Sequence, residues 1–315
     1  MNAITLTSVS KKFGEINAVD AVSLEVQKGE MYALVGPDGA GKTTVIRMLC
    51  GITLPTEGTL NLLGFDVVKQ TDEVRKRIGY LSQKFSLYGD LTIDENIEFF
   101  AEIHGVYDYE NRRNELLEFT RLTPFRTRFA EKLSGGMKQK LALACTLIHT
   151  PEIIFLDEPT TGVDPVSRRD FWKVLSSLLK TGITIVMTTP YLDEAERCSR
   201  VALMSEGKIL MADSPQNLKK VMKGEIVELV CPDIRKAFSL LKTNRDVSEV
   251  QAFGDRLNIL VPNAKRDVPP LLQFLKRNGI DEADWRTIPP SLENIFISLL
   301  SDHNAAKESE AVHHS

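Results

Sequence analysis

The chain has 315 residues, of which 43% are hydrophobic and 26% are charged, and its formal net charge at pH 7 is −4. These values are typical of a soluble protein with a sizeable core, and they lack the strongly basic balance of nucleic-acid-binding proteins. The four cysteines are too dispersed for a zinc site or a disulfide framework. No signal peptide is expected, and no apolar run approaches the about 20 residues that cross a bilayer. Any membrane role would therefore require docking onto another protein.

The first 51 residues predict strands that lead into a glycine-rich turn and a helix. Alternating apolar residues from 4 to 26 indicate strands, and the apolar run at 31–36 (MYALVG) indicates a buried strand. Residues 42–51 (KTTVIRMLCG) predict the helix. A strand, a glycine-rich turn and a helix in this order are the setting that a phosphate-binding loop requires.

The turn itself, residues 36–44 (GPDGAGKTT), matches the pattern G-x-x-x-x-G-K-[ST]. Glycines let the backbone wrap closely around phosphates, and backbone N–H groups at a helix start favour an anion. Lys42 is predicted to contact the β- and γ-phosphates, and the Thr43 hydroxyl to bind Mg²⁺. A chance glycine turn is the alternative, which the flanking strand and helix disfavour. The predicted nucleotide-binding residues here are Gly36, Pro37, Asp38, Gly39, Ala40, Gly41, Lys42, Thr43 and Thr44.

The middle of the chain predicts a helical insertion followed by a return to an α/β pattern. The insertion spans about 84–150, with helical spacing at 93–105, 110–122 and 134–149. Strands and helices then alternate at 152–159, 165–180, 182–189 and 193–198, and a hairpin is predicted at 201–213. Such alternation indicates a sheet with helices on its faces.

The most specific motif of the insertion is LSGGMKQK at 133–140. Ser134 suits the N-cap of the helix that follows. Together with Gly135 and Gly136 it forms a second helix start that favours an anion. One triphosphate does not need two such ends on the same chain, so we expect this one to face the nucleotide of another subunit.

Two carboxylates follow the buried strand in IIFLDEP (153–159). Ligands of open α/β sheets bind beyond the carboxyl ends of the strands. Asp157 is predicted to hold Mg²⁺, and Glu158 to polarise an attacking water as general base. Taken alone, this pair would more often be a helix N-cap, and it is the preceding phosphate loop that favours the catalytic interpretation.

A smaller unit is predicted at 224–300, after a first domain at 1–222. Its pattern of strand, helix, two strands, helix and strand is the order of a ferredoxin-like split βαβ unit. An amphipathic helix at 289–300 closes this α+β unit, and the polar tail at 301–315 is predicted to be flexible.

Together these motifs resemble the ATP-binding subunit of a bacterial ABC transporter over about residues 1–222. The resemblance rests on GPDGAGKTT, Gln83 in GYLSQKF, LSGGMKQK, IIFLDEP and TTGVD (160–164), in that order. It implies a P-loop ATPase fold and a head-to-tail dimer that encloses two ATP molecules, each between one phosphate loop and the partner's LSGG segment. The second subunit can be a copy of this chain or a different ATPase.

The resemblance also implies roles for individual residues. Phe13 matches the position whose ring stacks on adenine, although a strand residue in the core is the alternative. Gln83 matches the residue that links Mg²⁺ and the attacking water to the membrane partner. The helical insertion would form the groove that receives this partner, and Asp164 matches the loop that crosses the dimer interface.

The smaller unit resembles, more loosely, an appendage of ABC-2 type exporter ATPases, including drug exporters. The implied function is an ATPase that powers a membrane exporter through membrane-spanning permease subunits. The chain would then be cytoplasmic and peripheral on the inner face of the cell membrane. The motifs do not identify the cargo. A soluble ABC ATPase that acts on ribosomes or DNA is an alternative, which the lack of a second ATPase unit and of basic segments disfavours.

Two residues depart from the family pattern. Asp38 replaces an asparagine, and its carboxylate either points away from the phosphates or weakens their binding. Pro190, in TTPYLDEAE (188–196), replaces the switch histidine. Proline has neither a side-chain donor nor a backbone N–H. The loss of one charge-stabilising or proton-transfer group typically costs about 10²–10⁴-fold in rate.

We therefore hypothesise that this chain's own site binds ATP but hydrolyses it slowly, while its LSGG segment completes a competent site on a different subunit. The competing interpretation is a homodimer in which Glu158 alone suffices. A third is a regulatory partner that binds ATP with little hydrolysis of its own.

Overall fold

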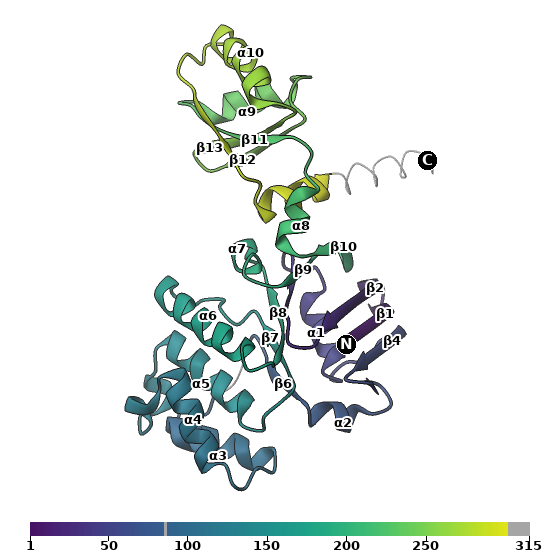
Figure 1. Cartoon of the computed structure of the whole chain (residues 1–315), viewed down its shortest axis with the longest axis vertical. Coiled ribbons are helices and arrows are strands. Elements are labelled where there is room, and N and C mark those ends of the chain that lie inside the picture. The colour runs from purple at the N-terminus through teal and green to yellow at the C-terminus, as the bar shows by residue number, and fades with distance from the viewer. Residues whose placement is uncertain (85–86, 302–315) are drawn as a thin grey trace. The chain divides into compact units, whose positions relative to one another are not determined.

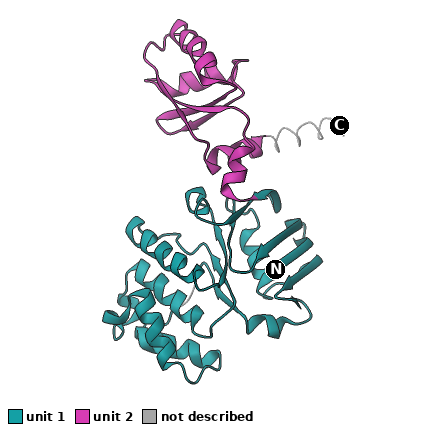
Figure 2. Ribbon diagram, viewed as in Figure 1, with its two compact units in different colours: residues 1–212 teal, residues 213–315 magenta. Residues whose placement is uncertain are grey.

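The computed structural model describes residues 1–84 and 87–301. Its contacts divide the chain into two compact units, residues 1–212 and 213–315 (Figure 2). The division falls before helix α8 (Pro215–Lys220), whereas the sequence placed the boundary at 222–224. The predicted tail lies, apart from Ser301, outside the described residues. No helix in the described part of the chain is long and apolar enough to cross a membrane.

Unit 1 contains a sheet of order β10-β9-β3-β8-β7-β6, in which β9, β3, β8, β7 and β6 run parallel to one another. Every residue of β3, β7 and β8 is buried, as expected for parallel strands that are covered on both faces. The strands of this sheet are β3 (Met31–Val35), β6 (Ile78–Leu81), β7 (Ile153–Asp157), β8 (Thr184–Thr189), β9 (Arg200–Ser205) and β10 (Lys208–Asp213).

A second, antiparallel sheet of unit 1 has the order β2-β1-β4-β5, with β1 (Asn2–Phe13), β2 (Ile16–Gln27), β4 (Glu57–Leu62) and β5 (Phe65–Asp66). Helix α1 (Lys42–Leu49) shares one hydrophobic core with both sheets, in which Leu6, Val26, Leu34 and Ile46 are almost completely buried. Helix α2 (Thr71–Arg75) follows β5. This packing fixes the position of α1, which follows the carboxyl end of β3 in the chain.

The predicted helical insertion consists of α3 (Ile93–Ile103), α4 (Glu110–Thr120) and α5 (Gly135–Leu147), with short 3-10 turns at Thr123–Phe125 and Ala130–Lys132. These helices gather on one side of unit 1, away from the β1–β2–β4 sheet (Figure 1). Thr92 begins α3 with a capping box to Glu95. Helices α6 (Pro165–Leu179) and α7 (Leu192–Ala195) follow strands β7 and β8.

Unit 2 forms an antiparallel sheet of order β12-β13-β11-β14. Its elements after α8 are β11 (Glu225–Val230), α9 (Ile234–Lys242), β12 (Glu249–Phe253), β13 (Arg256–Val261), α10 (Ala264–Arg277) and β14 (Asp284–Ile288). This is the βαββαβ order of a ferredoxin-like unit. Residues 292–301 are helical, and the side-chain amides of Asn294 and Gln251 are joined by a buried hydrogen bond of 2.7 Å.

Candidate nucleotide-binding site

The glycine-rich turn lies between the end of β3 and the start of α1, as the sequence predicted. Two of its glycines are required by close backbone contacts. A Cβ at Gly36 would lie 2.1 Å from the carbonyl oxygen of Met204, and one at Gly41 would lie 2.4 Å from that of Ala18. Gly41 is also the N-cap of α1 and has a φ of 94°, which side-chain-bearing residues rarely adopt. The loop is thus packed from behind and presents its amides at a helix start.

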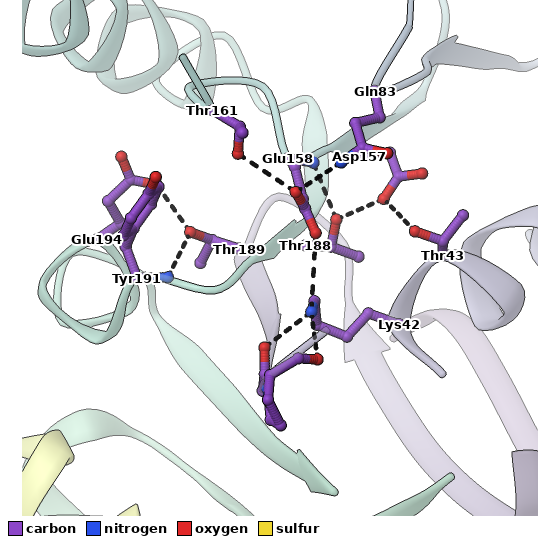
Figure 3. A network of polar contacts seen from close by, with 12 residues as sticks. Lys42, Thr43, Gln83, Asp157, Glu158, Thr161, Thr188, Thr189, Tyr191 and Glu194 are labelled. Atoms are coloured by element: carbon purple, nitrogen blue, oxygen red, sulfur yellow. Dashed lines mark hydrogen bonds and ion pairs between the residues drawn. The ribbon is translucent and has the colours of Figure 1, made fainter. Parts of the chain in front are cut away.

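Lys42 is only 4% exposed and its ammonium group is held inside the loop. Its Nζ donates to the carbonyl oxygens of Gly36 at 2.8 Å and Pro37 at 2.9 Å. The same atom lies 3.7 Å from Oε1 of Glu158 (Figure 3). The Lys42 ammonium group is thus paired with two backbone carbonyls and one carboxylate.

Glu158 is 7% exposed and is held by neighbours from several segments. Its Oε2 accepts from Nε2 of Gln83 at 2.9 Å and from Oγ1 of Thr161 at 3.3 Å. Its φ of 49° is uncommon for a residue with a side chain, and its N–H donates to Oγ1 of Thr188 at 2.9 Å. Backbone strain of this kind persists where the surroundings fix it, and it is common at functional sites.

Asp157 gathers hydroxyl groups around its buried carboxylate. Oδ1 accepts from Oγ1 of Thr43 at 2.9 Å and from Oγ1 of Thr188 at 2.6 Å, and the Tyr80 hydroxyl lies 3.4 Å from Oδ2. Burial, and then the charge of Asp157, raise the pKa of Tyr80 to about 12, so this phenol stays protonated. Hydroxyl, carboxylate and amide oxygens are hard ligands, and the set Thr43, Asp157 and Gln83 therefore fits Mg²⁺.

A cavity of about 610 Å³ is lined by Lys42, Thr43, Gln83 and Glu158, among others. Phe13 lines it and is 51% exposed, so it is not a core residue. Asp38 is exposed and also lines the cavity, and Pro190 occupies its wall. The complete lining is Phe13, Ala18, Asp38, Gly39, Ala40, Gly41, Lys42, Thr43, Thr44, Gln83, Glu158, Thr161, Pro190 and Tyr191.

The LSGG segment does not line this cavity. The Ser134 hydroxyl accepts from the N–H of Met137 at 3.3 Å and so caps α5. A Cβ at Gly136 would lie 2.3 Å from Cβ of Ser167, whereas one at Gly135 would meet nothing within 4 Å. Gly135 instead lines a separate cavity of about 460 Å³, which Gln83 also lines. The second helix start is therefore open and separate from the phosphate loop.

Sequence reasoning missed several polar neighbours of the predicted residues. Thr188 and Thr161 contact the two carboxylates, and Glu194 accepts from Thr189 at 3.0 Å and from Thr160 at 2.7 Å. Thr188 and Thr189 end the buried strand β8, and the pair at 160–161 follows β7 after Glu158 and Pro159. This position at the carboxyl ends of strands is the sequence signal that they carry.

Comparisons with known proteins agree with this geometry. Residues 19–161 match the family described as "ABC transporter". The chain is 41% identical over 303 residues to the Escherichia coli protein named "Probable multidrug ABC transporter ATP-binding protein YbhF", covering 94% of this chain but only 52% of that protein. The chain thus spans about half the length of this relative. It is 33% identical to the daunorubicin resistance ATP-binding protein DrrA3 of Streptomyces coeruleorubidus, covering 97% of this chain and 98% of that one.

Solved structures show the same relationship for the larger unit. An ATP-binding subunit of an ABC transporter superposes with a TM-score of 0.63 at 27% identity, over 70% of this chain and 92% of that one. A dimeric ATP-binding cassette in a post-hydrolysis state, bound to ADP and Pi, gives 0.60 at 28% identity, over 67% and 98%. The chain belongs to the family of ABC transporter ATP-binding proteins. The predicted family and its α/β P-loop fold are confirmed.

Proposed function

We propose that this chain is the ATP-binding and ATP-hydrolysing subunit of a membrane exporter. The observation that carries the proposal is that Lys42, Thr43 and Glu158 line one cavity at a glycine-rich helix start, with Asp157 hydrogen-bonded to Thr43. Relatives that carry the names multidrug, daunorubicin resistance and Nod factor export ATP-binding proteins support the same function.

In this proposal the phosphates of ATP rest on the amides of residues 36–44. The γ-phosphate takes the Lys42 ammonium away from the carbonyls of Gly36 and Pro37 and from Glu158. The adenine stacks on Phe13, whose ring is exposed at the end of β1. Asp38, on the cavity wall, keeps its carboxylate away from the phosphates.

Glu158 then polarises a water that attacks the γ-phosphorus in line, as the bond to the β-phosphate oxygen breaks and ADP leaves. Gln83 donates a hydrogen bond to Glu158, and it also lines the 460 Å³ cavity beside the helical insertion. It can therefore link hydrolysis to a membrane partner that docks on this insertion. Mg²⁺ held by Thr43, Asp157 and Gln83 would neutralise charge on the phosphates.

The partner in this scheme is a second ATPase subunit. Ser134 and Gly135 are exposed, and the LSGG segment lies outside the phosphate-loop cavity, so this helix start completes the site of another subunit rather than its own. The permease subunits contact the cytoplasmic ATPase at the membrane's inner face and select the cargo. Gly162, which lines the same cavity as Gly135, and Asp164 belong to the segment that crosses to the second subunit.

Pro190 favours a second candidate function. It lines the cavity where the family places a histidine, and it offers no donor to the γ-phosphate. The own site then hydrolyses slowly, and the chain serves in part as a regulatory partner that lends its LSGG segment to a competent subunit. Glu158 and its contacts with Gln83 and Thr161 favour real hydrolysis at the own site.

Binding of labelled ATP by the purified chain tests the proposal directly. Wild type is expected to bind ATP, and Lys42→Ala to lose about tenfold or more in affinity because a charge-assisted contact is removed. Lys76→Ala is the matched control, since Lys76 is exposed and its Nζ lies 2.9 Å from Oε1 of Glu73. Failure of wild type to bind ATP would contradict the proposal. A separate experiment, co-purification with a membrane protein, distinguishes a transport ATPase from a soluble one.

A further inference from the structure

The segment after β8 places Tyr191 on the wall of the phosphate-loop cavity. Its backbone N–H donates to Oγ1 of Thr189 at 3.0 Å, which fixes the turn around Pro190. The guanidinium carbon of Arg168 lies 4.5 Å from the centroid of the Tyr191 ring. Arg168 belongs to the first turns of α6, just after the N-cap Asp164. Tyr191 is thus held between the cavity and the helix that begins at the 160–164 turn.

A buried carboxylate fixes this arrangement. Glu194 is 1% exposed and accepts from Oγ1 of Thr160 at 2.7 Å. It also accepts from Oγ1 of Thr189 at 3.0 Å (Figure 3). Its Oε1 also lies 3.4 Å from Nε of Arg168. A buried charge is tolerated only when its partners are in place. Glu194 therefore joins the turn after β7, the end of β8 and the start of α6, and it determines where Arg168 meets Tyr191.

Pro190 leaves this wall of the cavity without a donor, and the next residue supplies one. Among the described residues, no partner forms a hydrogen bond with the Tyr191 hydroxyl. We propose that this hydroxyl donates a hydrogen bond to the terminal phosphate of bound ATP, in place of the missing histidine, and that Arg168 is the positioning residue that holds the ring. The inference rests on the proposed function, because it assigns a residue to the same nucleotide.

This assignment explains how a site with proline at position 190 can remain active. A hydroxyl can stabilise charge that develops on the γ-phosphate, but it cannot relay a proton as imidazole does. Because Arg168 follows Asp164 on α6, a shift of the 160–164 turn would move Arg168 and, through it, Tyr191. The phosphate contact would then depend on contact with the second subunit.

Nucleotide binding tests the contact without hydrolysis. The affinities of wild type and Tyr191→Phe are measured for the β,γ-imido analogue of ATP and for ADP, with Tyr107→Phe as control because Tyr107 is 87% exposed. Phenylalanine keeps the ring and its stacking on Arg168. Affinity for the analogue is expected to fall about 10- to 100-fold with ADP affinity unchanged, since only the triphosphate meets the hydroxyl. The inference would be overturned if Tyr191→Phe bound both the analogue and ADP as tightly as wild type does.

A double-mutant cycle tests the positioning role. Arg168→Lys keeps a charge near Glu194 but loses the planar group that stacks on the ring, and Arg169→Lys, exposed on the same helix, is the control. Arg168→Lys is expected to lower analogue affinity in wild type and to change it little in the Tyr191→Phe background. If the effects of Arg168→Lys and Tyr191→Phe on analogue affinity were additive, the positioning role of Arg168 would be overturned. A wild type that binds neither nucleotide would overturn the proposed function and the inference with it, whereas normal wild-type binding with an unaffected Tyr191→Phe overturns the inference alone.

Discussion

Nζ of Lys42 lies 3.7 Å from Oε1 of Glu158, and both side chains are almost completely buried. In this state the predicted phosphate-binding cation and the predicted general base neutralise each other. Removing one of them would leave the other as an uncompensated buried charge, which is strongly unfavourable. Nucleotide binding would divide the pair, giving the ammonium to a phosphate and leaving the carboxylate beside Gln83 and Thr161.

Restoring histidine at position 190 should accelerate hydrolysis. Pro190→His adds a side-chain donor and a proton acceptor at the cavity wall, and we expect turnover to rise about 10-fold or more. Steady-state phosphate release by wild type and variant, with ATP affinity measured in parallel, checks this. An unchanged rate would mean that the native site does not lack the histidine, and a self-sufficient homodimer would become the better description.

The two glycines of the LSGG segment should respond differently to alanine. A Cβ at Gly136 collides with Ser167, so Gly136→Ala is expected to destabilise unit 1 by about 1–3 kcal/mol. Gly135→Ala meets open space and should leave the free energy of unfolding within about 0.5 kcal/mol of wild type. Urea unfolding of both variants measures the difference. Equal stability losses would mean that the helix start is not packed as described.

Thr188 should matter for both stability and turnover. Thr188→Val removes the hydroxyl that joins Asp157 to the Glu158 N–H, and we expect a loss of about 1–3 kcal/mol together with a lower rate. Thr184→Val is the matched control, because Thr184 is a buried threonine at the other end of β8 that accepts from Gly29. It should cost stability without lowering the turnover of the folded protein. A normal rate in Thr188→Val would argue against its place in the site.

A stacked histidine pair should make unit 1 sensitive to acid. The rings of His104 and His149 lie 3.9 Å apart, and partial burial, followed by repulsion from His149, lowers the pKa of His104 from 6.5 to about 4. The folded state prefers the neutral His104 ring, whereas the unfolded chain takes up a proton near pH 6.5. The free energy of unfolding is therefore highest above pH 6.5 and decreases as the pH falls towards 4. Urea midpoints across this range should fall less steeply in His104→Phe. Identical slopes would exclude His104 as a source of the acid sensitivity.

Local motifs predicted much of this molecule because they depend on short stretches of chain. The phosphate loop, the carboxylates after β7 and the cap at Ser134 each follow from a few neighbouring residues, and the structure brings Lys42, Thr43, Asp157 and Glu158 together. Their chemical roles remain predictions.

Contacts that depend on tertiary packing had no such signal. Thr188 meets Glu158 only because β8 lies beside β7 in a register that pairs Asp157 with Thr188. The local sequence does not predict the positive φ of Glu158, since glutamate does not favour that conformation. The meeting of Tyr191 with Arg168 likewise requires α6 to pack beside the turn after β8.

We predict that this chain hydrolyses ATP with Glu158 as the base. The most direct measurement is Mg²⁺-dependent phosphate release by purified wild type beside Glu158→Gln, which keeps the shape of the side chain and removes its charge. We predict a measurable wild-type rate, at least about 100-fold slower hydrolysis in Glu158→Gln, and ATP binding retained in both. Equal rates in the two proteins would contradict the account.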